Sequence, residues 1–116
     1  IPDEPDLIKE RLINYCDNLK ADLVLTNGGT GFSARDFTPE ATREVIEKEA
    51  PGIPEAMRAS CLKLTKKAML SRAIAGIRNK TLIVNLPGSP QGVKESLGAI
   101  LEALVHGLDM IQGKEH

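Results

Sequence analysis

Two short glycine-bearing segments hold the residues whose types and spacing most strongly indicate chemistry. The first, Gly28 to Gly31, has three glycines in four residues and follows the apolar residues 21–26. The second, Pro87 to Ser89, follows the apolar residues 81–85. Backbone amides can approach an anion closely where glycine leaves no side chain in the way. A helix that begins after such a segment adds free amides and its dipole. Together the two segments favour a ligand that carries phosphate.

The same patterns have other interpretations, which the sequence leaves open. Residues 29–34 match the dinucleotide-binding pattern G-x-G-x-x-A. The next helix, however, is predicted to begin only at Thr38, too late for the tight strand-turn-helix geometry of such sites. No G-K-[S/T] follows the glycines, which excludes a Walker A loop. Pro87-Gly88 alone is also typical of an ordinary turn.

Asp36 follows the first glycine segment and places a carboxylate beside the predicted phosphate site. A carboxylate repels a phosphate unless a cation lies between them, and hard divalent ions such as Mg²⁺ bridge the two groups. The alternative is structural, because Asp36 could pair with Arg35 or cap the helix predicted at Thr38. Arg35, Arg72 and Arg78 flank predicted loops or strands and could bind phosphates or face solvent.

The histidines and cysteines support neither nucleophilic catalysis nor a zinc site. The spacing of Ser, Cys and acidic residues around His106 and His116 matches neither a catalytic triad nor a zinc site. Cys16 and Cys61 are too few and too far apart for a zinc cluster or a disulfide framework. Both lie on apolar faces of predicted helices, so we interpret them as reduced core thiols.

Hydrophobic periodicity predicts helices and strands in alternation around these segments. The predicted helices are residues 5–19, 38–50, a segment around 57–64 and a long helix from Pro90, and the predicted strands are residues 21–26, 73–78 and 81–85. Thr38 and Ser89 are the predicted N-caps, each followed by a proline. Asn79-Lys80 predicts a tight turn, and the strand after it is apolar enough to be central. The fold class is therefore α/β with a mostly parallel sheet, and both glycine segments are expected at its carboxyl edge.

The composition excludes several classes of function. The chain has 116 residues, 41% of them hydrophobic, which suits one domain over residues 1–116. Its 15 basic and 16 acidic residues give a net charge of -1, so the charge balance favours neither nucleic acid nor an anionic membrane. No apolar run is long enough to span a bilayer. The chain begins with isoleucine, lacks a signal-peptide pattern and has only three predicted strands, so we expect an N-terminal part of the domain to precede Ile1.

Six motifs occur in order along nearly the whole chain: residues 26–32, 35–42, 49–52, 68–72, 76–78 and 86–88. Together they resemble the molybdopterin adenylyltransferase family, which includes the bacterial Mog-type proteins and the G domain of gephyrin. The resemblance implies a three-layer α/β sandwich, a homotrimer and a cytoplasmic enzyme of molybdenum cofactor biosynthesis. It also implies the reaction. AMP passes from ATP to the phosphate of molybdopterin with Mg²⁺, pyrophosphate is released, and a molybdate-insertion protein uses the product.

The resemblance also implies roles for individual residues. Asp3 and Asp36 match the catalytic and Mg²⁺-binding carboxylates. The residues that match ligand contacts are Gly28, Gly29, Thr30, Gly31, Ser71, Asn85, Pro87, Gly88 and Ser89. Cys61 is a departure, because relatives often have serine there and a thiol is the weaker hydrogen-bond donor, so Cys61 either packs or weakens pterin binding. The family's N-terminal strand, Ser- and Asp-rich loop, first helix and second strand are also missing ahead of Ile1.

Other functions of the same fold compete with the transferase. A molybdopterin carrier or a trimeric scaffold would bind the pterin without transferring AMP, and ATP binding separates the two. A nucleotide hydrolase of the competence-damage type shares the fold, but residues 38–42 and 68–72 favour the transferases. The resemblance leaves open which glycine segment contacts AMP and which contacts the pterin.

Overall fold

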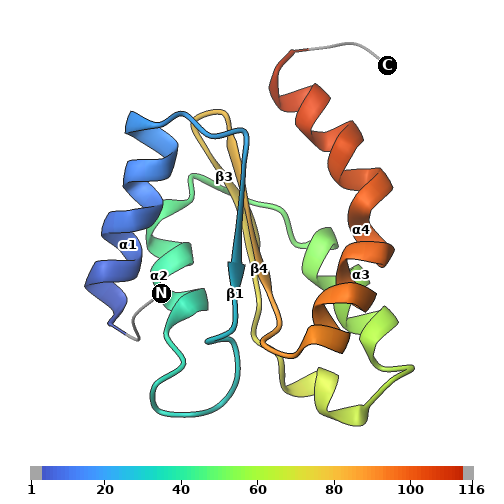
Figure 1. The fold of residues 1–116 in the computed structure, drawn as a ribbon. Coiled ribbons are helices and arrows are strands. Elements are labelled where there is room, and N and C mark those ends of the chain that lie inside the picture. Colours follow the sequence, from blue (N-terminus) through green and yellow to red (C-terminus); the bar gives the residue numbers. More distant parts are fainter. Residues whose placement is uncertain (1–3, 114–116) are drawn as a thin grey trace.

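The computed structural model describes residues 4–113 and has a four-stranded sheet with helices on both faces (Figure 1). The strands are β1 (Leu23–Asn27), β2 (Lys48–Glu49), β3 (Ala75–Arg78) and β4 (Thr81–Leu86), in the order β1-β4-β3-β2. The helices are α1 (Pro5–Ile13), α2 (Thr38–Val45), α3 (Gly52–Cys61) and α4 (Pro90–Ile111), with a π-helical turn η1 (Asn14–Asn18) and a 3₁₀ helix η2 (Lys66–Leu70). Helices α1 and α2 cover one face, and α3 and α4 cover the other. This arrangement confirms the predicted α/β class.

Strand β4 is an interior strand of the sheet, and all six of its residues are buried. Successive side chains of a strand point to opposite faces of the sheet. Leu82, Val84 and Leu86 therefore join the core under α3 and α4, whereas Ile83 joins the core under α1 and α2. The unbroken apolar pattern of this segment correctly predicted a central strand.

The sheet contains both parallel and antiparallel pairs. Strands β3 and β4 form an antiparallel hairpin through the predicted turn at Asn79-Lys80, and Asn79 takes a φ of 53°. Strand β1 is parallel to β4, and β2 is antiparallel to β3. Over residues 4–113 the sheet is thus mixed rather than mostly parallel, because a tight hairpin can join only antiparallel strands.

The helix predicted over residues 38–50 ends early, at Val45. Ile46 is extended, with a ψ of 150°, and the next residues form β2 against β3. Gly76 in β3 allows this approach, since a Cβ there would lie 2.5 Å from Ile46 Cδ1 and 2.7 Å from the Lys48 carbonyl oxygen. Local periodicity could not reveal a strand that depends on a glycine in a distant segment.

The predictions for the other helix ends are partly confirmed. The helix predicted over residues 5–19 runs through α1 and η1, and it buries Cys16 as a core thiol, whose pKa burial raises. Ser89 is the N-cap of α4, with its Oγ accepting a hydrogen bond from the Gly92 amide at 3.0 Å. Thr38 is not an N-cap, because Phe37 occupies that position and Thr38 is the first helical residue.

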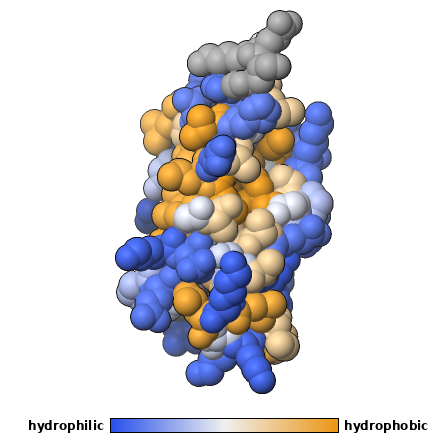
Figure 2. Space-filling model, turned by 90° about the vertical axis from the view of Figure 1, so that its right-hand side faces the viewer, coloured by the Kyte–Doolittle hydropathy of each residue, from blue (hydrophilic) through white to orange (hydrophobic). Residues whose placement is uncertain are grey.

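Some apolar side chains remain exposed on this fold. Residues 21–26 were predicted to form a buried strand, but β1 has a neighbour on one side only within residues 4–113, and Leu25 is 42% exposed. Figure 2 shows apolar side chains gathered on the side of the molecule that carries α4, where Leu101, Val105 and Met110 are exposed. None of the helices formed by residues 4–113 combines the length and apolarity that a bilayer span requires.

Candidate functional site

The two glycine segments meet at one edge of the sheet, as predicted. Because β1 and β4 are parallel neighbours, their carboxyl ends lie side by side. The Gly28 amide donates to the Leu86 carbonyl oxygen at 3.0 Å, and the Asn27 Nδ2 donates to the Pro87 carbonyl oxygen at 2.7 Å. These hydrogen bonds join the segments into a single surface.

A cavity of about 460 Å³ lies between this surface and the α3–η2 side of the molecule. That volume falls within the range of small-molecule sites. Eight of the predicted site residues line it: Gly28, Gly29, Thr30, Gly31, Ser71, Pro87, Gly88 and Ser89. The structure therefore brings most of the predicted ligand contacts together around one space.

The glycine segment needs glycine at specific positions. Gly28 and Gly29 have φ values of 87° and 70°, which side chains rarely adopt. A Cβ on Gly29 would also lie 2.3 Å from Thr38 Oγ1, too close for any real contact. The Gly29 carbonyl oxygen accepts from the Thr38 amide at 3.1 Å, so the turn is fastened to the start of α2.

The amino end of α4 forms the second wall of the cavity. Ser89, Gly92 and Ser96 all line it. Pro90 has no amide hydrogen, and the Gly92 and Val93 amides both donate to Ser89. What this end of the helix offers to an anion is therefore its dipole, which attracts negative charge. This wall can therefore bind phosphate without a lysine or arginine.

Asp36 lies in the loop after the glycines but not in the cavity lining. Its Oδ2 accepts a hydrogen bond from the Ser33 amide at 2.9 Å and lies 3.0 Å from the point where a Cβ on Gly31 would be. Gly31 does line the cavity, so the carboxylate sits directly behind the cavity wall. Within residues 4–113, no three His, Cys, Asp or Glu side chains are grouped to hold a metal ion. Asp3, the other predicted carboxylate, is outside the described residues.

The structure does not bring Asn85 to the cavity. Its side chain is fully buried, where Nδ2 donates to Thr26 Oγ1 and Thr42 Oγ1 at 3.0 Å each and Oδ1 accepts from the Ile74 amide at 3.1 Å. Because both Nδ2 hydrogens and Oδ1 are engaged, this side chain connects β1, α2 and the segment before β3. Its predicted place among the ligand contacts is corrected to a structural one.

Asn85→Ala is expected to lower the free energy of unfolding by about 3 kcal/mol, since it leaves three buried polar groups without their partner. Urea unfolding measures this change. Asn18→Ala is the control, because Asn18 is exposed and donates only to Asn14. Unchanged stability in Asn85→Ala, with ligand affinity lost, would instead make Asn85 a ligand contact.

The three arginines considered as phosphate ligands lie in different places and have different contacts. Arg78 pairs with Asp17 at 2.9 Å and donates to the Val45 carbonyl oxygen, at the end of β3 away from the glycine segments. Arg35 lies in the loop outside the cavity lining. Arg72 hydrogen bonds to the backbone of residues 30–36, which we call the glycine loop. It also pairs with Glu40, and that pairing lowers the pKa of the Glu40 carboxyl.

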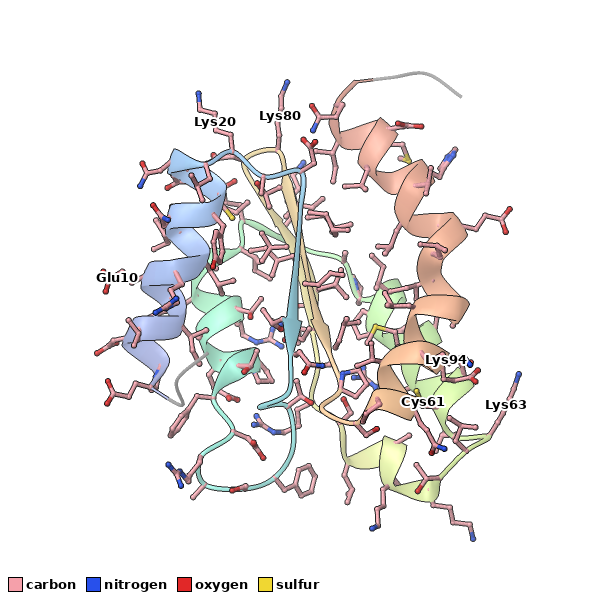
Figure 3. The ribbon with its side chains drawn as sticks, viewed as in Figure 1. Glu10, Lys20, Cys61, Lys63, Lys80 and Lys94 are labelled. Atoms are coloured by element: carbon pink, nitrogen blue, oxygen red, sulfur yellow. The ribbon has the colours of Figure 1, made fainter. Side chains whose placement is uncertain are left out.

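Sequence reasoning missed the wall that α3 and η2 provide. Met57 and Cys61, interpreted as core residues from their helical spacing, line the cavity although each is largely buried. Figure 3 places Cys61 toward the end of the molecule away from Lys20 and Lys80. Arg58 and Lys67 add two cationic side chains to the lining. The i, i+4 spacing of Met57 and Cys61 was visible in the sequence, but it does not distinguish a cavity wall from a core.

The chain is similar to known proteins over most of its length. Residues 1–106 match the family model described as "Probable molybdopterin binding domain". The chain is 50% identical over 113 residues to the molybdopterin adenylyltransferase of Helicobacter pylori strain J99, covering 97% of this chain and 64% of that protein. It is 46% identical over 114 residues to gephyrin of Dictyostelium discoideum, covering 98% of this chain and 16% of that protein.

The solved structures give the same result. The molybdopterin biosynthesis enzyme MoaB of Thermus thermophilus superposes with a TM-score of 0.90 at 54% identity, covering 97% of this chain and 71% of that one. The chain thus spans less than two thirds of the Helicobacter pylori protein, and somewhat more of the solved one.

Proposed function

The chain belongs to the probable molybdopterin binding domain family, and we propose that the protein is a molybdopterin adenylyltransferase of molybdenum cofactor biosynthesis. The substrates are ATP and molybdopterin, and the products are adenylyl-molybdopterin and pyrophosphate. The observation that carries the proposal is the convergence of two anion-binding segments on one cavity. A reaction that joins two phosphorylated molecules needs both to be held close together.

The cavity suits the two chemical halves of the ligands. The glycine segment offers backbone amides to phosphates, and the amino end of α4 adds the positive end of its dipole. The opposite wall carries apolar side chains, including Met57 and Leu70, against which a flat ring can pack. Arg58 and Lys67 lie in the same lining and can offset the negative charge of the phosphates. Cys61 offers a thiol beside Ser96, with Sγ and Oγ 3.3 Å apart.

The reaction is an in-line displacement at the α-phosphorus of ATP. A phosphate oxygen of molybdopterin forms the new P–O bond, and the bond to the bridging oxygen of pyrophosphate breaks. No protein nucleophile is required. The protein lowers the barrier by orienting the two anions and by stabilising the charge that develops on the leaving group.

Asp36 is the described residue that fits Mg²⁺. In residues 4–113 its Oδ1 has no hydrogen-bond partner, and Mg²⁺ is usually held by one or two carboxylates together with substrate phosphates. By resemblance, Asp3 is the second carboxylate. When bound, Mg²⁺ supplies screening of the repulsion between the phosphates. The role of Asp36 is to hold a negative charge at the Gly31 wall.

The partners of the protein belong to the same proposal. We propose a cytoplasmic homotrimer that passes its product to a molybdate-insertion protein. The exposed apolar side chains near α4 support self-association, because monomers rarely expose large apolar patches. Residues 1–116 are proposed as one molybdopterin-binding domain.

Binding calorimetry on the full-length protein separates the transferase from a molybdopterin carrier or scaffold, the alternative of a different class. We expect ATP to bind in the presence of Mg²⁺, with micromolar to millimolar affinity, as is usual for substrates. A pure carrier binds molybdopterin and gives no heat with ATP. That second result would overturn the transferase and retain the carrier.

A further inference from the structure

We propose that Arg72 is a positioning residue, which fixes the glycine loop against the cavity wall and thereby aims the Asp36 carboxylate. The inference rests on the proposed function for its kinetic consequences, but its structural part can be tested without it. Arg72 is not in the cavity lining, so its effect on the reaction passes through the loop.

The contacts of Arg72 reach both ends of the loop. Its Nε donates to the Gly31 carbonyl oxygen at 2.7 Å, and its Nη2 donates to the Asp36 carbonyl oxygen at 2.8 Å. Its backbone amide donates to the Thr30 carbonyl oxygen at 2.8 Å. One residue thus spans residues 30–36 with three hydrogen bonds.

The direction of the guanidinium is itself fixed. Its Nη1 pairs with Glu40, which lies in the first turn of α2. Three of its nitrogens are therefore committed at once, in the flat fork that only arginine provides. The side chain is 33% exposed, so these bonds are partly shielded from water.

Arg72 also connects two walls of the cavity. It directly follows Ser71, which lines the cavity from the η2 side. The η2 wall and the glycine loop therefore meet at Arg72.

The loop transmits the position of Arg72 to Asp36. The Asp36 amide donates to the Ser33 carbonyl oxygen at 3.0 Å, and the Asp36 carboxylate accepts from the Ser33 amide at 2.9 Å. Residues 33–36 are thus a closed turn, and Arg72 holds the carbonyl oxygen of its last residue. If that hydrogen bond is lost, the turn and its carboxylate can move as a unit.

The test uses Arg72→Ala and Arg72→Lys in the full-length protein, with Arg43→Ala as the matched control. Arg43 is also an arginine with a glutamate partner, Glu49 at 2.9 Å, but it makes no contact with the loop. The first measurement is hydrogen exchange of residues 31–36 in the ligand-free protein. We expect exchange about tenfold faster or more in Arg72→Ala, and no change in Arg43→Ala.

The second measurement is the kinetics of pyrophosphate release. Loss of a residue that orients a metal-binding carboxylate typically costs about 10- to 100-fold in activity or metal affinity. We expect kcat to fall by that factor and the Mg²⁺ concentration for half-maximal rate to rise several-fold, with the KM for ATP nearly unchanged. Arg72→Lys keeps the charge but not the fork, so it should restore little. A direct phosphate ligand would instead raise the KM for ATP.

Unchanged loop exchange in Arg72→Ala would overturn the proposal. If that variant does not fold, Arg72→Lys, which keeps the long stem and the charge, gives the same comparison with the same expected rise. If the wild-type protein releases no pyrophosphate, the proposed function fails while the exchange measurement still decides the role of Arg72.

Discussion

Asp36→Asn is expected to lower the rate of adenylyl transfer by about 100- to 1,000-fold, the usual cost of losing one charge-stabilising group. Asparagine has the same shape, and its Oδ1 can still accept from the Ser33 amide, so the loop should keep its geometry. Only the negative charge is lost. Affinity for molybdopterin should change little, because Asp36 lies behind the cavity wall and not in it. Initial rates and pterin titration measure the two effects separately.

Asp22→Asn is the matched control for this change. Asp22 precedes β1, at the opposite edge of the sheet, and its carboxylate accepts from Gln112 Nε2 at 3.1 Å. We expect wild-type rates. If Asp36→Asn also turned over at the wild-type rate, the carboxylate would have no part in catalysis, and the structural alternative for Asp36 would be correct.

Gly29→Ala is expected to abolish ligand binding and to lower the free energy of unfolding by about 3 kcal/mol. Two causes add. The φ of 70° is unfavourable for alanine, and the new Cβ would lie 2.3 Å from Thr38 Oγ1. Relief of the clash must displace the turn that offers its amides to the cavity. Urea unfolding and ATP calorimetry measure the two losses.

A second substitution separates these causes. Thr38→Ala removes the Oγ1 atom, so Gly29→Ala combined with Thr38→Ala should recover part of the stability and leave the backbone strain. Gly98→Ala is the control, because a Cβ there meets nothing within 4 Å in the middle of α4, and it should stabilise by up to about 1 kcal/mol. Normal ATP binding by Gly29→Ala alone would mean that the glycine segment is only a turn.

Many helix starts, turns and strand ends were predictable because a few adjacent residues specify them. Ser89-Pro90 marked the start of α4, and Asn79-Lys80 marked the hairpin, since caps and turns depend on a few adjacent residues. Two apolar strands, each followed by glycine, were enough to place both segments at one edge. The convergence of the ligand loops followed from that topology.

What the sequence did not reveal depends on contacts between distant segments. Asn85 has a side-chain amide of the kind that binds ligands. Only its buried hydrogen bonds to Thr26, Thr42 and Ile74 show its structural role. The early end of α2 depends on Gly76. Such partners come from other strands and helices, and no pattern within one window specifies them.

The cavity wall on α3 was hidden for a related reason. Met57 and Cys61 have the spacing of core residues, and both are in fact largely buried. Their exposed remainder lines the cavity because the glycine segment opposite them has no side chains to fill the space. Whether a buried helix side chain borders a cavity depends on the segment that faces it. The sequence of the helix alone does not specify that segment.

Transfer of a label from the α-phosphate of ATP to the pterin decides whether this site transfers AMP. The full-length protein is mixed with molybdopterin, Mg²⁺ and ATP labelled at that phosphate. We predict that label appears on the pterin, with one pyrophosphate released for each labelled product. If molybdopterin binds tightly while the label stays in ATP, the protein is a carrier and does not transfer AMP.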